Sequence, residues 1–163
     1  MIHRFFSPEQ LEGRNEIDLP KEISHQIKNV LRLKAGERFF MFDGTGYDFL
    51  MEFSGSKSAK VVEKLLNRRE PSRKVILFQS LFNKDKMEWI FQKGTEIGIS
   101  DFVPTQTHRS VKKDFNRERA EKIIKGAAQQ SGRAVLPKLC ALMSFKEALE
   151  YVQKERISGV IAD

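Results

Sequence analysis

The side chains best suited to chemistry lie between Lys74 and Arg133, where apolar segments end and helical segments begin. In open α/β sheets, ligands bind in the crevice beyond the carboxyl ends of the strands. Cations and amides at such an edge suit an anionic ligand, and an arginine there can hold a phosphate through two parallel hydrogen bonds. We therefore interpret six polar residues as one site: Lys93, Glu96, Arg109, Ser110, Gln130 and Arg133.

The charged members of this set each have two interpretations. Lys93 and Glu96 are three residues apart, so they share a helix face and can pair. Glu96 then either accepts a proton or orients a neighbouring cation. Arg109 follows an apolar strand and is expected to face a ligand, with an ordinary surface charge as the alternative. Arg133 follows a helix and either binds the ligand or stabilises the helix dipole.

Several other chemistries lack their sequence signatures. His3, His25 and His108 are far apart, and no cysteine pair or carboxylate cluster has the spacing of metal ligands. No dinucleotide-binding glycine motif, P-loop lysine or nucleophile elbow occurs, which disfavours dinucleotide-dependent oxidoreductases, NTPases and serine hydrolases. The single cysteine, Cys140, cannot form an internal disulfide, and we interpret it as a small buried hydrophobic residue.

Charge is concentrated in one segment of the chain. The formal net charge is +7, and residues 109–133 hold eight Lys and Arg against three Asp and Glu. Such a segment attracts polyanions and releases their counterions on binding. The alternative is a solvated helix face carrying pairs such as Glu118 with Lys122. The cations that we expect to contact nucleic acid here are Lys112, Lys113, Arg117, Lys122 and Lys125.

The composition is that of a folded chain without a membrane anchor. Hydrophobic residues make up 40% of the 163 positions, enough to bury a core. The first ten residues lack the long apolar region of a secretory signal, and no apolar run has the length needed to span a bilayer. Together with the single cysteine, these features predict a cytoplasmic location.

Residues 1–70 are predicted to form a small β-barrel. Short apolar runs alternate with turn residues, and Gly44, Thr45 and Gly46 favour a tight hairpin. After Pro20, apolar residues at helical spacing predict a helix over 21–31 whose inner face includes Val30. The predicted strands are 3–6, 16–19, 38–43, 47–53 and 59–66.

Residues 71–163 are predicted to form a second domain, after a polar linker at Asn67–Lys74. Strands and helices alternate, which is typical of a parallel sheet and places the chain in the α/β class. The predicted strands are 75–79, 102–105, 138–142 and 157–162. The helices are predicted to begin at Asp85, Asn116 and Ser144, the last with a capping box to Glu147. In the first of them Ile97 is assigned to the inner face and Gly98 to the end.

The last predicted strand coincides with the end of the chain at Asp163. Strands of a parallel sheet prefer neighbours and helical cover on both sides. The pattern therefore predicts that further chain should follow, with an edge strand as the alternative.

A series of short motifs, in order along nearly the whole chain, resembles the bacterial RsmE family of 16S ribosomal RNA uridine-N3 methyltransferases. The motifs are His3-Arg4-Phe5-Phe6, His25-x5-Leu31-Arg32-Leu33-x2-Gly36, Phe42-Asp43-Gly44, Gln79-Ser80-Leu81, Lys84-x2-Met87, Gln92-Lys93-x2-Glu96-x-Gly98, Pro104, Arg109-Ser110 and Gln130-Ser131-Gly132-Arg133. The resemblance implies a PUA-like RNA-binding barrel followed by a SPOUT-type domain with a trefoil knot, S-adenosylmethionine as methyl donor, and a homodimer.

The resemblance also assigns roles to individual residues. It implies that the reaction centre is bordered by Lys93, Glu96, Arg109 and Arg133, and that RNA is faced by Arg4, His25, Arg32 and Lys34. The partner implied is 16S ribosomal RNA or the small ribosomal subunit, with no metal and no membrane.

The sequence departs from the family at its end. The glycine-rich GPEGG-type loop and the LGxRILRxETA-type segment, which form the knot and most of the cofactor pocket, do not occur here. We therefore expect the second domain to be the N-terminal half of a SPOUT domain, assign no cofactor-binding residues, and expect little activity from these residues alone. The alternatives are a non-catalytic RNA-binding module and a dimerising fragment.

Overall fold

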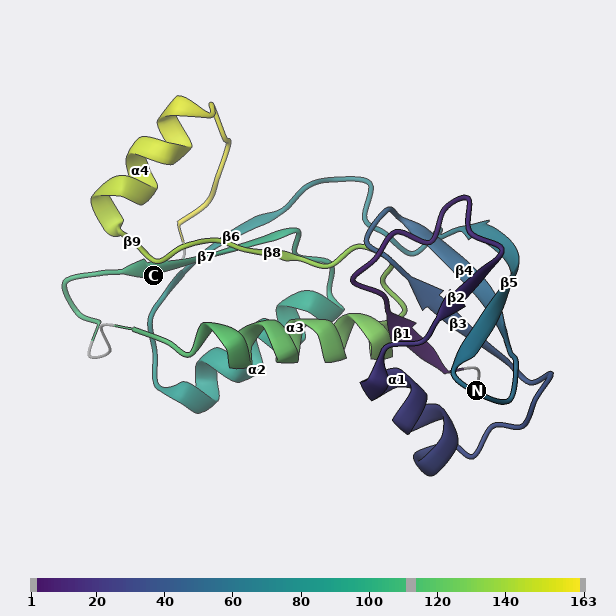
Figure 1. Cartoon of the computed structure of the whole chain (residues 1–163). Helices are drawn as coiled ribbons and strands as arrows, with labels where there is room; N and C mark the ends of the chain where they lie inside the picture. The colour runs from purple at the N-terminus through teal and green to yellow at the C-terminus, as the bar shows by residue number, and fades with distance from the viewer. Residues whose placement is uncertain (1–2, 111–113, 162–163) are drawn as a thin grey trace. The chain divides into compact units, whose positions relative to one another are not determined.

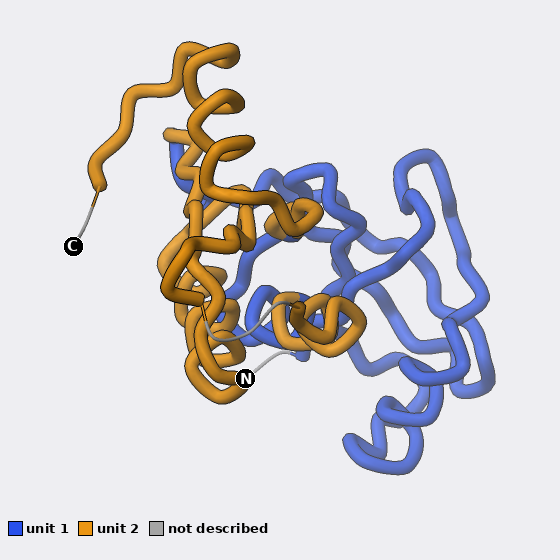
Figure 2. Tube along the Cα trace, turned by 90° about the vertical axis from the view of Figure 1, so that its left-hand side faces the viewer, with its two compact units in different colours: residues 1–72, 125–136 blue, residues 73–124, 137–163 orange. Residues whose placement is uncertain are grey.

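The protein folds into two compact units in its computed structural model, which describes residues 3–110 and 114–161. The first unit comprises residues 1–72 and 125–136, and the second comprises residues 73–124 and 137–163 (Figure 2). Each is described by itself below. In the described ranges no helix is long and apolar enough to cross a membrane.

The first unit is built on a curled five-stranded sheet (Figure 1). Its first strand pairs in parallel with the third, and the remaining pairs are antiparallel. In sheet order the strands are β1 (Arg4–Phe6), β3 (Arg38–Phe42), β4 (Tyr47–Phe53), β5 (Ser58–Leu66) and β2 (Glu16–Asp18). The predicted strands of this region therefore all form.

The β3–β4 hairpin turns at the predicted glycines. Gly44 and Gly46 have φ angles of 89° and 87°, a region that side chains with a Cβ rarely adopt. Asp43 accepts hydrogen bonds from the backbone N–H and the hydroxyl of Thr45, which closes the turn. Alternate residues of the two strands, such as Phe49 and Met51, then point into the core.

The predicted helix over 21–31 changes type partway. α1 (Lys21–His25) is followed by a π-helical segment, η1 (Gln26–Val30). The N–H of Leu31 bonds the carbonyl of Gln26, five residues back, at 2.8 Å. This wider turn keeps Ile27 buried but rotates Val30 off the inner face, so its predicted burial is wrong and it is 66% exposed.

The second unit contains a parallel sheet centred on one strand. β7 (Asp101–Gln106) pairs with β6 (Ile76–Ser80) on one side. On the other side it pairs with β8 (Lys138–Leu139) near its start and with β9 (Met143–Ser144) near its end. The predicted strand over 138–142 is therefore wrong in extent. Residues 157–161 of the predicted last strand have no strand structure, and position 162 lies outside the described residues.

Pro104 explains the break between β8 and β9. The carbonyl of Thr105 accepts from Leu81 on the β6 side, whereas the carbonyl of Phe102 accepts from Cys140 on the other side. Backbone groups alternate along a strand, so Pro104 faces the β8–β9 side together with Phe102. Because proline has no N–H, it cannot donate to the ladder there, and pairing stops.

Three helices complete the second unit, with α3 shared between the units. They are α2 (Lys84–Glu96), α3 (Arg117–Ser131) and α4 (Phe145–Lys154). The caps predicted at Asn116 and Ser144 are confirmed, the latter as a complete capping box. The cap predicted at Asp85 is wrong, because Asn83 instead accepts from the N–H of Lys86 at 3.1 Å.

The helices cover both faces of the parallel sheet (Figure 1). Leu77 on β6 packs into the cluster built by α2 and α3, which includes Phe91 and Ile124. Its neighbour Phe78 points the other way and meets Tyr151 of α4, with ring centroids 6.0 Å apart. Ile97, predicted inward, follows the last residue of α2 and is 79% exposed.

Two glycines in helices give opposite expectations for substitution by alanine. A Cβ at Gly94 would lie 2.6 Å from the buried ring of Phe102, whereas a Cβ at Gly126 has no neighbour within 4 Å. Gly94→Ala should destabilise by about 1–3 kcal/mol through overpacking, which exceeds its gain in helix propensity. Gly126→Ala should stabilise by up to about 1 kcal/mol. Urea unfolding of both variants checks this, and a Gly94→Ala variant as stable as Gly126→Ala would contradict it.

Candidate functional site

Because of the direction in which α2 runs, the predicted site residues of the second unit lie at two different edges of the sheet. α2 begins just after the carboxyl end of β6 and ends just before the first residue of β7. Because β6 and β7 are parallel, the start of α2 lies at the carboxyl edge of the sheet and its end at the amino edge. Lys93 and Glu96, in the last turn of α2, therefore lie at the amino edge.

Lys93 and Glu96 form the predicted pair. The Lys93 Nζ lies 2.7 Å from the Glu96 Oε2, and Gln92 donates to the other carboxylate oxygen at 3.1 Å. The hydrogen bond from Lys93 is the largest cause of a lowered pKa of Glu96. A carboxylate with a lowered pKa is a weaker proton acceptor, so this geometry favours the orienting role over the role of base.

Arg109 lies at the opposite edge of the same sheet. It is exposed in a turn after β7, in which the N–H of Ser110 bonds the carbonyl of Thr107 and its hydroxyl accepts from the Thr107 N–H at 3.0 Å. The five steps between the first and last residues of β7, at about 3.3 Å each, put the two edges about 17 Å apart. The structure therefore does not bring Arg109 together with the Lys93–Glu96 pair.

Arg133 belongs to the first unit, where it is buried against Glu70. Its Nε and Nη2 lie 3.3 and 3.1 Å from the Glu70 Oε2, and the two side chains are 5% and 19% exposed. The other Glu70 oxygen accepts from the backbone N–H groups of Ala134 and Val135, at 2.7 and 2.9 Å. The sequence carried no signal for Glu70, which falls inside the predicted linker.

Arg4 is also largely buried and paired within the first unit. It donates to Asp48 at 2.7 Å and to the carbonyl of Arg133 at 3.2 Å. Asn67 donates to both Asp48 and the carbonyl of Gly132, at 2.9 Å each. We call this set the arginine network: Arg4, Asp48, Asn67, Glu70 and Arg133. The side chain of Arg4, predicted to face RNA, is held inside this network.

The other residues of the first unit that were predicted to face RNA are exposed. His25, Arg32 and Lys34 all lie in or just after the α1–η1 segment. The Nδ1 of His25 is 2.8 Å from the Nδ2 of Asn29. Arg32 has a φ of 55°, an unusual value for a residue with a Cβ, which directs the chain away from the helix. The structure therefore gathers these three side chains on one exposed segment.

The predicted basic segment divides into paired and stacked cations. Arg117 donates to the carbonyls of Leu139 and Cys140. Lys122 pairs with Glu118 at 2.7 Å, and the Nζ of Lys125 is 5.7 Å from the centre of the Phe6 ring. All of these pairs lie within one unit or the other. Lys112 and Lys113 lie outside the described residues.

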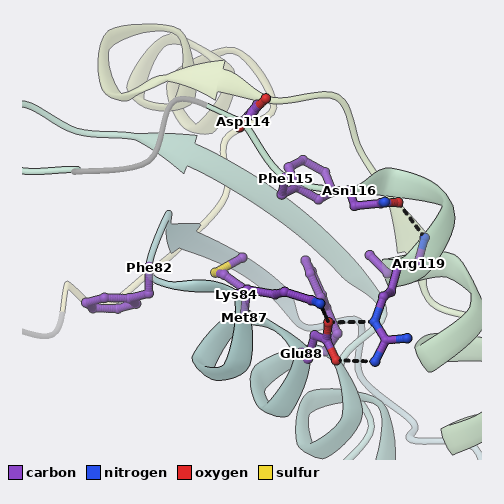
Figure 3. Close-up of a pocket in the computed structure, with 10 residues that line it drawn as sticks. Phe82, Lys84, Met87, Glu88, Asp114, Phe115, Asn116 and Arg119 are labelled. Carbon is purple, nitrogen blue, oxygen red and sulfur yellow. Dashed lines mark hydrogen bonds and ion pairs between the residues drawn. The ribbon is translucent and has the colours of Figure 1, made fainter.

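A pocket of about 190 Å³ lies at the carboxyl edge of the second unit, between the starts of α2 and α3 (Figure 3). The sequence analysis missed it, although both helices were expected to begin at this edge. The approximate start of each helix was predictable from the sequence, but the closeness of the two starts in the fold was not. The residues that line it are Phe82, Lys84, Met87, Glu88, Phe91, Asp114, Phe115, Asn116, Arg119 and Ala120.

The described residues offer no group of three or more His, Cys, Asp and Glu that could hold a metal ion. Among the residues that line the pocket, Glu88 pairs with Arg119, with Nε–Oε1 and Nη2–Oε2 distances of 2.6 and 2.8 Å, and more distantly with Lys84 at 3.9 Å.

Residues 68–162 match the family model described as an RNA methyltransferase domain. Among solved structures, the fold resembles a ribosomal RNA small subunit methyltransferase E from Neisseria gonorrhoeae bound to S-adenosyl methionine. The TM-score is 0.82 at 28% identity, covering 92% of this chain and 66% of that one. The α/β class, with a barrel-like sheet before a SPOUT-type parallel sheet, is confirmed by this likeness.

Relatives of known description identify the family within the RNA methyltransferases. The protein of the same description from Bacillus subtilis is 33% identical over 165 residues, which cover 93% of this chain and 64% of the relative. The Synechocystis protein is 30% identical, with 78% of this chain and 44% of the relative covered. The chain belongs to the ribosomal RNA small subunit methyltransferase E family, RsmE, and spans 64% of the length of its Bacillus relative.

Removal of Glu70 should lower stability, because it takes away one acceptor of the buried Arg133 guanidinium and the acceptor of the Ala134 and Val135 N–H groups. Glu70→Ala and Arg133→Ala should each lower the free energy of unfolding by about 3–5 kcal/mol. The double variant should lose less than the sum of the two, since both single changes remove the same contact between Glu70 and Arg133. Glu118→Ala, which breaks an exposed pair, is the control and should leave the unfolding midpoint nearly unchanged. Additive losses in urea unfolding would contradict the pairing.

Proposed function

We propose that this protein transfers a methyl group from S-adenosylmethionine to N3 of a uridine in 16S ribosomal RNA. The observation that carries the proposal is the likeness, over 92% of the chain, to a methyltransferase E structure bound to S-adenosyl methionine. The match of residues 68–162 to the RNA methyltransferase domain supports the same class of reaction. The base and the atom methylated belong to the proposal.

The two parts of the chain have different proposed roles. Residues 1–70 form the PUA-like RNA-binding domain, which is supported by the curled sheet and by the exposed His25, Arg32 and Lys34. Residues 71–163 form the N-terminal half of the methyltransferase domain, which is supported by the parallel sheet in the matched region. The protein acts in the cytoplasm as a homodimer, on 16S ribosomal RNA or the small ribosomal subunit.

Arg109 is the residue that we propose next to the reacting base. Uracil N3 carries a proton and becomes a good nucleophile only as that proton leaves, so negative charge develops on the ring. A well-aimed cation can stabilise such charge by about 3–4 kcal/mol. Arg109 is exposed at the carboxyl edge, where ligands of α/β sheets bind, which supports this role. In this proposal Lys93, Glu96 and Arg133 do not contact the reacting base. They stabilise the fold that positions Arg109.

No described residue is assigned to the cofactor. Pockets for ligands of that size usually measure about 300–1,000 Å³, so the pocket of about 190 Å³ between α2 and α3 does not fit it. The role of S-adenosylmethionine in the proposal therefore comes from the relatives, and we derive no step of the reaction through it.

A second candidate is an RNA-binding module without catalysis. It is favoured by the exposed cations of α3. A dimerising fragment is a third. Methyl transfer to 16S ribosomal RNA by the natural full-length protein distinguishes the enzyme from both, because neither alternative transfers a methyl group.

Binding and catalysis should respond to different residues. Arg109→Ala in the natural full-length protein should change RNA affinity by no more than a few-fold and lower methyl transfer by about 100-fold. Charge reversal at Arg117, Lys122 and Lys125 should weaken binding about equally for all RNA sequences and flatten its salt dependence. Filter binding and single-turnover methylation measure the two effects. Normal turnover of Arg109→Ala at saturating RNA would exclude Arg109 from the reaction centre.

The 163-residue chain should bind S-adenosylmethionine weakly, because the glycine-rich loop and the later segment that form most of the family's cofactor pocket do not occur in it. Calorimetric titration should give no saturation at micromolar concentrations. The same titration on the Neisseria gonorrhoeae relative, whose structure holds S-adenosyl methionine, is the positive control. A saturable low-micromolar isotherm with the 163-residue chain would show that its residues suffice for the cofactor.

A further inference from the structure

The pocket between the starts of α2 and α3 has no role in the reaction proposed above. We call it the α2–α3 pocket and define it by the ten residues already given. Its volume of about 190 Å³ is below that of pockets for drug-sized ligands, so it suits a single small ring system. Its location at the carboxyl edge is the usual place for a ligand in an α/β sheet.

The walls of the α2–α3 pocket are aromatic and apolar. Met87 and Phe91 are buried at its base, and the Phe115 ring lies 6.0 Å from that of Phe91. Phe82, just before α2, is 48% exposed. Nucleobases stack on aromatic side chains whatever the nucleotide sequence, because every base has a flat π-face.

The charges around the α2–α3 pocket cancel. Its cations are Lys84 and Arg119, and its anions are Glu88 and Asp114 (Figure 3). The hydrogen bond from Arg119 is the largest cause of the lowered pKa of Glu88, so this pair stays ionised and mutually neutralised. A wall with balanced charge does not select a phosphate. It accepts a neutral ring.

Asn116 supplies a hydrogen-bond donor at the α2–α3 pocket. Its Oδ1 accepts from the N–H of Arg119 at 2.9 Å, which caps α3. Among residues 3–110 and 114–161, none accepts a hydrogen bond from its Nδ2. That amide can donate to a carbonyl oxygen of a nucleobase, which is the way side-chain amides read bases.

A cation stands beside the aromatic wall. The Nζ of Lys86 lies 5.6 Å from the centre of the Phe82 ring. A nucleotide stacked on Phe82 would therefore have a positive charge near its ring, to which its phosphate could pair. Lys86 does not line the pocket. Its charge therefore suits the phosphate of a nucleotide whose neutral base lies inside.

We propose that the α2–α3 pocket binds one unpaired base of the RNA substrate. The base stacks on Phe82 and Phe115 and accepts a hydrogen bond from Asn116. The proposal rests on the proposed function in so far as RNA is the substrate, and it adds the place where a single base is held.

The test compares two RNAs that differ only in their bases, using the 163-residue chain. A hexauridylate and an abasic hexamer of equal charge are titrated by fluorescence anisotropy. The chain should bind hexauridylate about tenfold more tightly than the abasic hexamer. Phe82→Leu keeps the site apolar but removes the ring, and should reduce this ratio below about threefold while leaving the affinity for the abasic hexamer unchanged.

Two further variants make the test specific. Asn116→Asp preserves the cap of α3, since aspartate caps helices as well as asparagine, but it removes the Nδ2 donor and should also lower the ratio. Trp89→Leu is the matched control, because Trp89 is an aromatic residue of α2 that is 61% exposed and does not line the pocket. It should keep the ratio of the unchanged chain. Thermal melts establish that all variants are folded.

The outcomes separate this proposal from the proposed function. Phe82→Leu and Asn116→Asp variants with an unchanged ratio would overturn the base pocket, as would equal losses for both hexamers. The proposal would also be overturned if Trp89→Leu lowered the ratio of the two affinities as much as Phe82→Leu does. The proposed function is decided independently by methyl transfer in the full-length protein, which none of these measurements uses.

Discussion

The first unit depends on the carboxylate of Glu70. One of its oxygens meets the Arg133 guanidinium and the other meets the N–H groups of Ala134 and Val135. The contact joins residues 63 to 65 positions apart, and it attaches the segment after α3 to the sheet formed by the first 66 residues. Buried ion pairs are weak contributors to net stability, but their geometry is demanding. We therefore see Glu70 chiefly as the residue that fixes the register of positions 132–136 on the sheet.

This attachment gives α3 two different surroundings. Its first turns are held in the second unit by the Asn116 cap and by Arg119 on Glu88. Its last turns belong to the first unit, where Ala128 packs with Phe42 and Ala134 in a small cluster. Small side chains let the helix approach closely there, whereas at its start the long side chains of Arg117 and Arg119 bond to neighbouring segments of the second unit. The first turns of α3 are therefore basic, and its last turns pack in a core cluster.

The elements that follow from local chemistry were predictable. The hairpin at Gly44 and Gly46, the cap at Asn116 and the capping box at Ser144 each need only a few neighbouring residues. The misplaced elements needed information from elsewhere. Asn83 competes with Asp85 for the start of α2, and only the path of the chain out of β6 decides between them. The π-helical turn after His25 likewise depends on the core around Ile27.

The candidate site was less predictable than the fold. Lys93 and Glu96 were correctly paired, but the grouping with Arg109 ignored that α2 runs back across the sheet and carries them to the far edge. Arg133 could not be placed without Glu70, whose partners are remote in sequence. The division at residues 70 and 71, and the roles given to the site residues, remain predictions.

Pro104 has a consequence for how this sheet can vary between related proteins. In an ordinary strand, one inserted residue shifts the register and turns every later side chain to the opposite face. Here pairing stops after β8 and begins again at β9, because Pro104 offers no N–H to the residues between them. Insertions or deletions at positions 141 and 142 would be absorbed in that gap. Leu139 would stay in the core and α4 would still begin at its capping box, so this gap is a point at which the fold tolerates changes in length.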